Sequence, residues 1–500
     1  MLLENDWFLV LVYFVILIIL VVISDVLYKK FDVSGKITRR IVHISVGLVI
    51  CTTPFILDNW LPPALLATMF IIANTIAIKN KMMQGIHSAP RISYGTVFFP
   101  ISYLVLILLF WRSAPGIIII SMLLLTISDP LAAIIGEKYG VTFNKYLHDE
   151  KSYKGLISVF ISSFLLTLIS LIIMSETGFI DSISMLNIFV ISISVALIAV
   201  PAEAVSIKGT DNLSLPLLSA IMLSIMWDAS LMVNIQNLAW IFLAIGVAIG
   251  SFYAGALSAN GTAGAVVVGS FIFTIGGLAW LIPLGIFFIL SSLLSKIGKK
   301  RKTSLKNIVI KGGRRDISQV YANGGVALVL VIIYHFVSDP IFYIMFLGSL
   351  AAANADTWET EIGTYFKRGT RSIINFLKVP PGTSGGVSII GTMGGIFGAG
   401  LIALSVMFYH RPDLDRLLIF IITTVSGILG SIADSYSGAL LQAQYTCSEC
   451  SLKTERLIHC NTATRHTAGI KWINNDMVNL ICTISGALIA LLCYSLCSVW

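Results

Sequence analysis

The sequence predicts an all-α, polytopic membrane protein of about 16 transmembrane helices, divided into two halves of about eight. Of its 500 residues, 57% are hydrophobic and only 12% are charged, and the mean hydropathy is +0.91. Apolar runs long enough to cross a bilayer recur almost from end to end. These runs lack the alternation of barrel strands, and a helix satisfies its own backbone hydrogen bonds in lipid.

The predicted spans follow the apolar runs in order. The acidic start MLLENDW lacks the basic region and cleavage site of a signal peptide, so the first run is predicted to be a span. The segments 261–277 and 341–355 are short, and re-entrant or broken helices are expected there. The predicted spans are 7–28, 41–57, 61–78, 92–110, 116–136, 155–175, 187–204, 214–232, 236–256, 261–277, 279–295, 318–337, 341–355, 386–409, 417–440 and 477–499.

The basic residues predict the orientation. With the N-terminus outside, alternate loops hold every Lys and Arg except Arg112, Arg411 and Arg416. The positive-inside rule then makes these loops cytoplasmic. The net charge of +8 therefore requires no nucleic-acid partner. We expect a multi-pass protein of the cell membrane with its motifs facing the cytoplasm. The predicted cytoplasmic loops are 29–40, 79–91, 137–154, 205–213, 296–317, 356–385 and 441–476.

Each half carries its own set of polar motifs, which predicts two membrane domains, residues 1–235 and 236–500. In the first, an acid near the end of a span is costly in lipid and marks a functional position. Acids that hold Mg²⁺ and a lysine that binds nucleotide phosphates are what phosphoryl transfer requires. The candidate catalytic residues of this half are Asp129, Lys151, Glu203 and Asp211, and the candidate substrate- or phosphate-binding residues are Arg40, His43, Ser152 and Asn212.

The motifs of the first half resemble a known family. The order R-R-x-x-H, S-D-P-x-A-x-x-x-G-x-x-x-G, K-S-x-x-G and E-A-x-x-x-x-G-x-D-N over about residues 35–220 is similar to the dolichol kinase and phytol kinase family. The resemblance implies phosphorylation of an isoprenoid alcohol, with CTP as a common donor. Lys154 and Leu156 depart from the family, which has an acid and a serine there. The matching positions are Asp129, Gly136, Lys151, Ser152, Gly155, Glu203, Asp211 and Asn212.

The second half places acids, basic residues and glycines together. Asp356 and Glu359 are three apart and share a helix face, whereas Glu361 points elsewhere. With Asp434 they are candidate catalytic residues and ligands of a hard cation such as Mg²⁺. Paired glycines expose backbone N–H groups to an anion, and arginine binds phosphate bidentately. The candidate phosphate-binding residues are Gly312, Gly313, Arg314, Arg315, Asn323, Gly382, Thr383, Gly385 and Gly386.

This half resembles the membrane family called domain of unknown function 92, which includes transmembrane protein 19 and plant phytyl-phosphate kinase. The similar segments are SSLLSKIGKKRK, KGGRRDISQVYANGG, ADTWETEIG, VPPGTSGGVSIIGT, SIADSYSGALLQ and NNDMVNL, in one order from about residue 250 to 485. The resemblance implies transfer of a second phosphate onto an isoprenyl monophosphate.

The loop before the last span contains Cys447-x-x-Cys450, His459, Cys460 and His466. This spacing is compatible with a small structural zinc site formed by Cys447, Cys450 and Cys460. The usual second CxxC is missing, which favours reduced cysteines without a metal.

The sequence favours a bifunctional isoprenoid kinase that uses Mg²⁺ and CTP or another nucleotide such as ATP, with a membrane lipid as substrate. Two alternatives stay open: a lipid cytidylyltransferase, and a transporter or flippase for lipid phosphates. A transporter would require polar groups reachable from both membrane faces, whereas the motifs here lie in loops predicted to share one face. No G-x-x-x-x-G-K-[ST] motif occurs, which excludes a P-loop enzyme.

Overall fold

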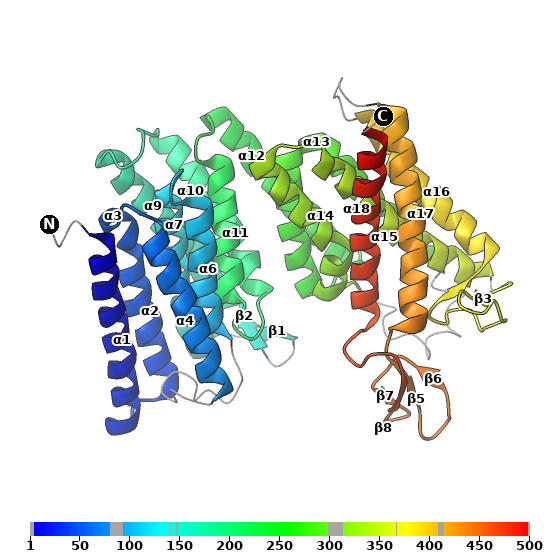
Figure 1. Ribbon diagram of the computed structural model, residues 1–500, viewed down its shortest axis with the longest axis horizontal. Helices are drawn as coiled ribbons and strands as arrows, with labels where there is room; N and C mark the ends of the chain where they lie inside the picture. Colours follow the sequence, from blue (N-terminus) through cyan, green and yellow to red (C-terminus); the bar gives the residue numbers. More distant parts are fainter. Residues whose placement is uncertain are drawn as a thin grey trace. The chain divides into compact units, whose positions relative to one another are not determined.

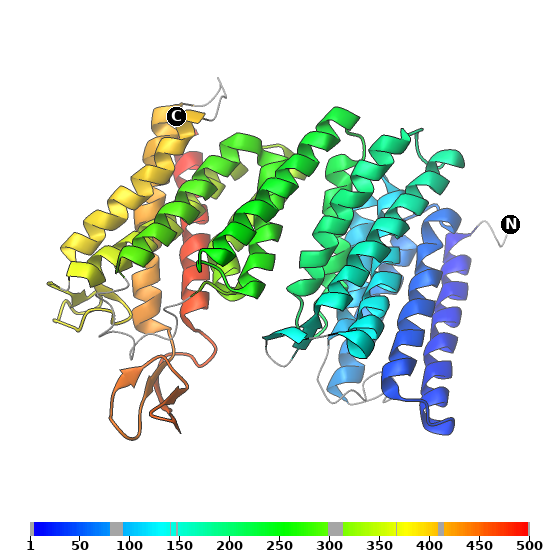
Figure 2. The same ribbon diagram turned by 180° about the vertical axis from the view of Figure 1, so that it is seen from behind.

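A computed structural model describes residues 5–80, 94–140, 142–146, 149–298, 314–366, 368–408 and 415–498. The chain forms two compact units, Met1–Leu243 and Ala244–Trp500. Figures 1 and 2 show each unit as a bundle of helices from two opposite sides. The boundary falls inside helix α12 (Leu231–Tyr253), close to residue 235, where the motif sets divide.

Unit 1 consists of helices and one short β-hairpin. Polar side chains mark several helix starts: Asn5 accepts a hydrogen bond from Trp7 N, and Ser184 accepts one from Asn187 N, as expected of N-caps. The hairpin pairs β1 (Thr142–Tyr146) with β2 (Asp149–Ser152) in antiparallel register. The other helices are α1 (Asp6–Lys30), α2 (Gly35–Cys51), α3 (Thr53–Ile56), α4 (Leu61–Lys79), α6 (Gly95–Phe110), α7 (Pro115–Leu123), α8 (Asp129–Tyr139), α9 (Tyr153–Glu176), α10 (Met185–Ala204) and α11 (Asp211–Met226).

Asp129 lies in the middle of a span, where the sequence predicted the end of one. Helices α7 and α8 are continuous through a π-helical turn, η1 (Leu124–Ser128), and together form one candidate span, Pro115–Tyr139. At 1.5 Å per residue, Asp129 lies about 15 Å before Tyr139. A π-turn interrupts the regular hydrogen-bond ladder and is frequent at functional sites. Here it immediately precedes the acidic residue.

Unit 2 contains α13 (Ala259–Gly298), which is two helices joined by a sharp turn at Gly277, where φ is +58°. Its two halves form a hairpin. The backbone of Arg315 lies against Gly261, and its guanidinium lies 5.7 Å from the ring of Phe287. A straight helix would separate residues 261 and 287 by about 39 Å. The break predicted between the spans 261–277 and 279–295 is therefore present, at a glycine that can adopt a positive φ.

Helix α15 (Ile341–Phe366) is the central helix of unit 2. It is a continuous helix of 26 residues, so the broken helix predicted at 341–355 is wrong. Around it pack α14 (Ile317–Val337), α16 (Ile389–Leu404), α17 (Arg416–Leu440) and α18 (Asn475–Ser498).

Small residues allow the close packing around α15. A Cβ atom on Gly430 of α17 would lie 2.5 Å from Ala352, and one on Gly348 would lie 2.5 Å from the carbonyl of Gly486 in α18. Such contacts are typical of packing through small residues in membrane helices. The buried Asn354 is satisfied on both sides, because it accepts from Ser291 of α13 and donates to Gly398 O of α16.

Two pieces of β-structure lie beside the helices of unit 2. β3 (Arg371–Ser372) pairs with β4 (Gly386–Val387) and closes the loop that contains the glycine motif. Between α17 and α18, residues 441–474 form a separate lobe, which we call the cysteine lobe; Figures 1 and 2 show it beyond the adjoining ends of these helices. Its strands are β5 (Gln444–Thr446), β6 (Lys453–Thr454), β7 (Ile458–His459), β8 (Thr462–Ala463) and β9 (Arg465–Ala468).

The membrane character of the chain is clear from the helices. Among the described residues, 12 helices are long and apolar enough to cross a membrane. Two further apolar helices, Gly95–Phe110 and Asp211–Met226, are shorter. The predicted count of sixteen spans and the predicted orientation remain predictions.

Candidate functional site

Three acidic side chains predicted to be catalytic come together in unit 1. Asp129, Glu203 and Asp211, which we call the unit-1 acid cluster, each offer one carboxylate oxygen within 4.8 Å of the others. They come from α8, the end of α10 and the start of α11. Packing of these helices therefore collects acids that are up to 82 positions apart in the sequence.

Lys151 is the basic residue that pairs with the unit-1 acid cluster. Its Nζ forms an ion pair with Glu203 and lies 3.7 Å from Asp211 Oδ2. The β1–β2 hairpin carries this lysine just before α9 begins. Burial by itself would lower the pKa of Lys151, but the carboxylates of Glu203 and Asp211 raise it above its usual value. These carboxylates therefore favour the charged form of the lysine.

The donor set of this cluster fits a hard divalent cation. Three carboxylates face Lys151, and Arg39 also interacts with Asp211, which leaves one negative charge in excess. The second oxygen of Glu203, Oε2, is buried and has no hydrogen-bond partner among the described residues. Buried polar atoms normally have partners, and carboxylate oxygens are the ligands that Mg²⁺ prefers. Asp129, Glu203 and Asp211 could therefore hold Mg²⁺.

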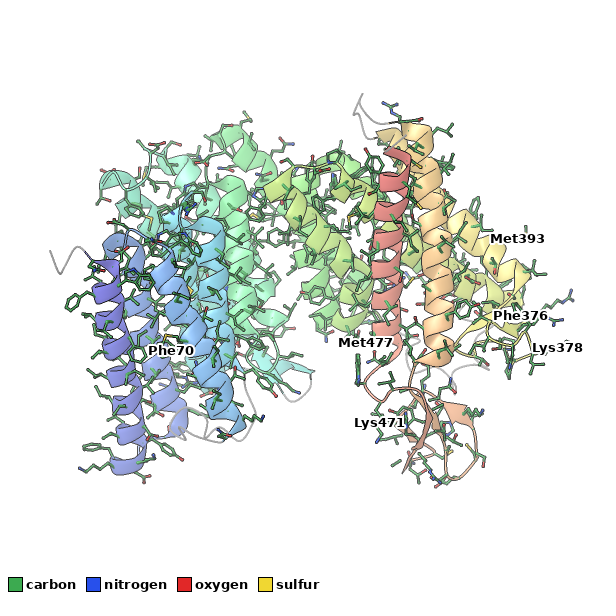
Figure 3. All side chains as sticks on the ribbon, in the orientation of Figure 1. Phe70, Phe376, Lys378, Met393, Lys471 and Met477 are labelled. Atoms are coloured by element: carbon green, nitrogen blue, oxygen red, sulfur yellow. The ribbon has the colours of Figure 1, made fainter. Side chains whose placement is uncertain are left out.

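An apolar pocket adjoins the cluster. Its walls are formed by α1, α2, α4 and α6, and one of its lining residues is Phe70 of α4, labelled in Figure 3. Three of its lining residues, Arg39, His43 and Asn212, are polar groups next to the acids. The other lining residues are mostly apolar: Tyr13, Leu17, Val21, Val42, Val46, Ile50, Thr53, Leu66, Ala67, Phe70, Asn74, Gly95, Thr96, Phe99, Pro100 and Tyr103.

His43 connects the pocket to the acid cluster. Its Nε2 lies 2.9 Å from Leu125 O in the π-helical turn and 3.8 Å from Asp129 Oδ2. A carbonyl oxygen only accepts, so Nε2 carries the hydrogen in this contact. The side chain of Asn212 is fixed as well, because its Nδ2 donates to Asp211 Oδ1 at 2.9 Å and to Gly209 O at 3.2 Å.

Arg39 lines the pocket, whereas the sequence pattern had indicated Arg40 as the substrate- or phosphate-binding residue. Arg40 forms an ion pair with Glu137 at 2.9 Å, and Lys36 lies 3.4 Å from the same carboxylate. Arg39 lines the pocket and interacts electrostatically with Asp211. The i,i+4 relation of Arg39 to His43, which puts both on one helix face, was the signal that could have identified it.

Ser152 and two motif glycines have structural roles that explain their spacing. Ser152 is the N-cap of α9 and accepts a hydrogen bond from Gly155 N at 3.1 Å. A Cβ on Gly136 would lie 2.9 Å from Ser152 Oγ, and one on Gly155 would lie 3.1 Å from Ala132 O. These residues let α8 and α9 approach closely. The predicted contact of Ser152 with phosphate therefore competes with its capping role.

In unit 2, α15 and α17 face each other through two pairs of polar residues. Asp356 and Asp434 are hydrogen-bond partners. One turn away, Glu359 accepts from Ser431 Oγ at 2.6 Å and from Thr392 Oγ1 at 3.0 Å. Asp356 and Glu359 thus share a helix face, as the spacing predicts. The hydroxyl groups that donate to Glu359 could not be predicted from the sequence.

Asp356 and Asp434 together fit a cation better than the predicted triplet with Glu359. Two ionised carboxylates repel each other, so their close contact requires a proton or a cation between them. Asp434 Oδ1 is buried and has no hydrogen-bond partner in the described part of the chain. Both oxygens of Glu359 are already bound by hydroxyl groups. Asp356 and Asp434 are the residues that could hold Mg²⁺ here.

Among the described residues, the basic and amide groups predicted to bind phosphate in unit 2 contact partners other than Asp356 and Asp434. Arg314 lies over the ring of Phe252 at 5.3 Å, and Arg315 packs on Phe287 and interacts with Glu361, which also accepts from Ser295 at 2.9 Å. Asn323 donates to Gln319 O within its own helix. Gly312 and Gly313 lie outside the described residues.

The glycine loop, residues 380–386, is fixed against α17 and the cysteine lobe. Gly382 and Gly385 have φ of +84° and +72°, and Thr383 donates to Pro380 O at 2.7 Å. Ser384 donates to Glu455 of the cysteine lobe at 2.9 Å. Partial burial raises the pKa of Glu455. Next to this loop, Phe376 and Lys378 are exposed, and Figure 3 shows them at the edge of the unit.

Fold and sites define the class of protein: an integral membrane protein with a cluster of acidic side chains inside each of two helical units. The sequence profile of the family described as integral membrane protein DUF92 matches residues 242–487. An uncharacterized membrane protein of Methanocaldococcus jannaschii is 31% identical over 238 residues, which are 48% of this chain and 86% of the relative.

Another relative is named as a kinase. Phytol kinase of Synechocystis is 30% identical over 217 residues, which are 42% of this chain and 87% of the relative. Protein PGR of Arabidopsis thaliana is 26% identical over 218 residues, 39% of this chain and 75% of the relative. No solved structure matches the chain. The chain belongs to the DUF92 family of integral membrane proteins through its second half and is related to phytol kinase, which confirms both resemblances seen in the motifs.

Gly385 provides a test of the glycine loop. A Cβ there would lie 2.3 Å from the Cβ of Ala439 in α17, and φ is +72°. Gly369 has a similar φ of +69° with nothing within 4 Å, so Gly369→Ala is the matched control. We expect Gly385→Ala to destabilise unit 2 by about 1–3 kcal/mol more than the control, because overpacking adds to the strain of a positive φ. Thermal unfolding in detergent measures the difference; equal losses would contradict the close contact with α17.

Proposed function

We propose that the chain is a bifunctional membrane isoprenoid kinase. Unit 1 would phosphorylate an isoprenoid alcohol of the phytol or geranylgeraniol type, and unit 2 would add a second phosphate to the monophosphate. The observation that carries the proposal is the apolar pocket of unit 1, whose polar residues Arg39, His43 and Asn212 adjoin the acid cluster and Lys151. The relationship to phytol kinase supports the same substrate class.

In unit 1, the isoprenoid chain would occupy the apolar pocket with its hydroxyl group near His43. Asp129, 3.8 Å from His43 Nε2, would accept the hydroxyl proton on its carboxylate. Arg39 and Lys151 would neutralise the charge that develops on the transferred phosphoryl group. Bound Mg²⁺ would supply further charge neutralisation at the nucleotide phosphates. Phosphoryl transfer depends mainly on such positioning and electrostatic stabilisation.

In unit 2, the acceptor would be the monophosphate of the lipid. Asp356 and Asp434 would hold Mg²⁺, and the glycine loop with exposed Thr383 would offer backbone and hydroxyl groups to phosphate. The intermediate carries an apolar chain and would remain in the membrane between the two steps. This retention is a physical reason for both activities to reside in one chain. CTP or ATP would be the donor.

The purified protein should therefore phosphorylate phytol and phytyl phosphate when Mg²⁺ and labelled CTP or ATP are supplied. A nucleoside diphosphate should be released as the second product. Release of pyrophosphate would instead show cytidylyl transfer. Failure to phosphorylate alcohols or their monophosphates with any nucleotide would refute the proposal.

Lys151→Met should reduce phosphorylation of the alcohol by ~100-fold or more, the usual scale for loss of one group that stabilises charge in the transition state. The effect follows from loss of the cation between Glu203 and Asp211. Glu137→Gln is the matched control, because Glu137 is about half exposed and pairs with Arg40 and Lys36 away from the pocket. Initial rates with saturating nucleotide give the comparison. Similar rates for both variants would exclude the lysine from the reaction.

Filling the pocket should change the preferred chain length. Ala67 of α4 lines the pocket and is 3% exposed, so Ala67→Phe should lower kcat/KM for a twenty-carbon alcohol more than for a ten-carbon one. A twofold to tenfold change in the ratio is expected, on the scale of about 1 kcal/mol per displaced methylene. Leu65→Phe, on the exposed side of the same helix, is the control. An unchanged ratio in Ala67→Phe would show that the alcohol binds elsewhere.

A further inference from the structure

The cysteine lobe brings together four potential zinc ligands. Cys447, Cys450, His459 and Cys460 each offer one ligand atom within 4.8 Å of the others. Cys450 Sγ lies 3.8 Å from Cys460 Sγ and 3.5 Å from His459 Nδ1, and Cys460 Sγ lies 3.2 Å from the same nitrogen. Zn–S bonds of about 2.3 Å and Zn–N bonds of about 2.1 Å give S···S of about 3.8 Å and S···N of about 3.6 Å in a tetrahedron. The Cys450–Cys460 and Cys450–His459 spacings match these values, and the Cys460–His459 spacing is shorter.

The backbone is shaped to present these atoms. β5 and β6 form a hairpin whose tip is Cys447–Cys450, and Ser451 after it has φ of +58°. The backbone N–H groups of Glu449 and Cys450 donate to the Cys447 sulfur. Such N–H···S contacts stabilise a thiolate, which is the form that binds metal.

A second hairpin, β7–β8, turns at Cys460 and Asn461, both with positive φ. A positive φ at two consecutive non-glycine residues costs free energy, and a bound metal would offset that cost. The two hairpin tips therefore meet from different parts of the lobe, at the only place where the described cysteines cluster with a histidine.

The sulfur atoms are not joined in a disulfide. The distance of 3.8 Å between Cys450 Sγ and Cys460 Sγ exceeds the bond length of about 2.05 Å, and Cys447, Cys450 and Cys460 are all free thiols. His466, which has similar sequence spacing, lies instead against Tyr445 with ring centroids 5.4 Å apart. It is outside the ligand set.

We propose that Cys447, Cys450, His459 and Cys460 bind one structural Zn²⁺ that holds the cysteine lobe against the glycine loop. All four ligands come from the protein, as in closed structural zinc sites. The lobe has little apolar core of its own, and small domains commonly depend on a metal for stability. Glu455, five positions after Cys450, accepts a hydrogen bond from Ser384 and so connects the lobe to the glycine loop.

The full-length protein, purified in detergent under reducing conditions, should contain about one zinc per chain by elemental analysis. Cys450→Ser with Cys460→Ser should lose most of it, and His459→Gln should weaken retention during dialysis against a chelator. The matched controls His466→Gln and Cys497→Ser should keep the zinc of the wild type. Cobalt(II) added to the metal-free wild-type protein should give the absorption of a tetrahedral thiolate site. This measurement needs no variant.

Three results would overturn this site: wild-type protein without zinc and without the cobalt spectrum, full zinc in the double variant, or a Cys450–Cys460 disulfide in peptide mapping. Proteolysis at Lys378 tests whether the metal holds the glycine loop in place, because Lys378 is exposed beside residues 380–386. Chelation should speed tryptic cleavage after Lys378 severalfold in the wild type. Unchanged cleavage would refute the positioning of the loop by the metal.

Discussion

Carboxylates inside a membrane helix bundle have to be compensated, and this constraint shapes both units. An ionised acid near the bilayer centre costs several kcal/mol unless it has a partner. In unit 1, the compensation comes from Lys151, carried by a β-hairpin that precedes α9. The chain thus uses a short extra-helical element to deliver a cation to acids that α8, α10 and α11 bring together. Removing one partner would leave an uncompensated charge, which is far more costly than never having the pair.

Unit 2 meets the same constraint in a different way. Hydroxyl groups from α16 and α17 donate to Glu359, while Asp356 and Asp434 contact each other with no basic side chain beside them among the described residues. Such a pair needs a proton or a cation. The two units therefore differ: the acids of unit 1 are paired with a lysine, whereas the acid pair of unit 2 needs a shared proton or a bound cation, which the proposed Mg²⁺ would supply. This difference suits two successive steps on different acceptors.

The positions of the helices could be predicted from the sequence because long apolar runs have few alternatives in lipid. The prediction failed for α15, whose apolar run stops near Ala355 although the helix continues to Phe366. Hydropathy indicates which part of a segment is buried in lipid. The helix itself is stabilised by its own hydrogen bonds and by packing on α16 and α17, and these continue past the apolar run. The acids that were expected in a loop therefore lie on this helix, which packs against α16 and α17.

The acids of the candidate sites could be predicted, whereas their partners largely could not. Asp129, Glu203 and Asp211 stand out as charges in or beside apolar runs, but the choice between Arg39 and Arg40 depends on the rotation of α2. Ser431 and Thr392 are ordinary small residues until α15 brings Glu359 to them. Cys447, Cys450 and Cys460 of the proposed zinc site could be predicted from their spacing, whereas the place of His459 beside them depends on the β7–β8 hairpin.

The claim that the chain has two separate kinase sites is tested most directly by Asp129→Asn and Asp356→Asn. Each purified variant would be supplied with Mg²⁺, labelled nucleotide and either phytol or phytyl phosphate, and the lipid products would be separated. The account predicts that Asp129→Asn fails on phytol but still converts phytyl phosphate to the diphosphate, and that Asp356→Asn accumulates the monophosphate. Loss of both steps in either variant, or of neither step in Asp356→Asn, would contradict it.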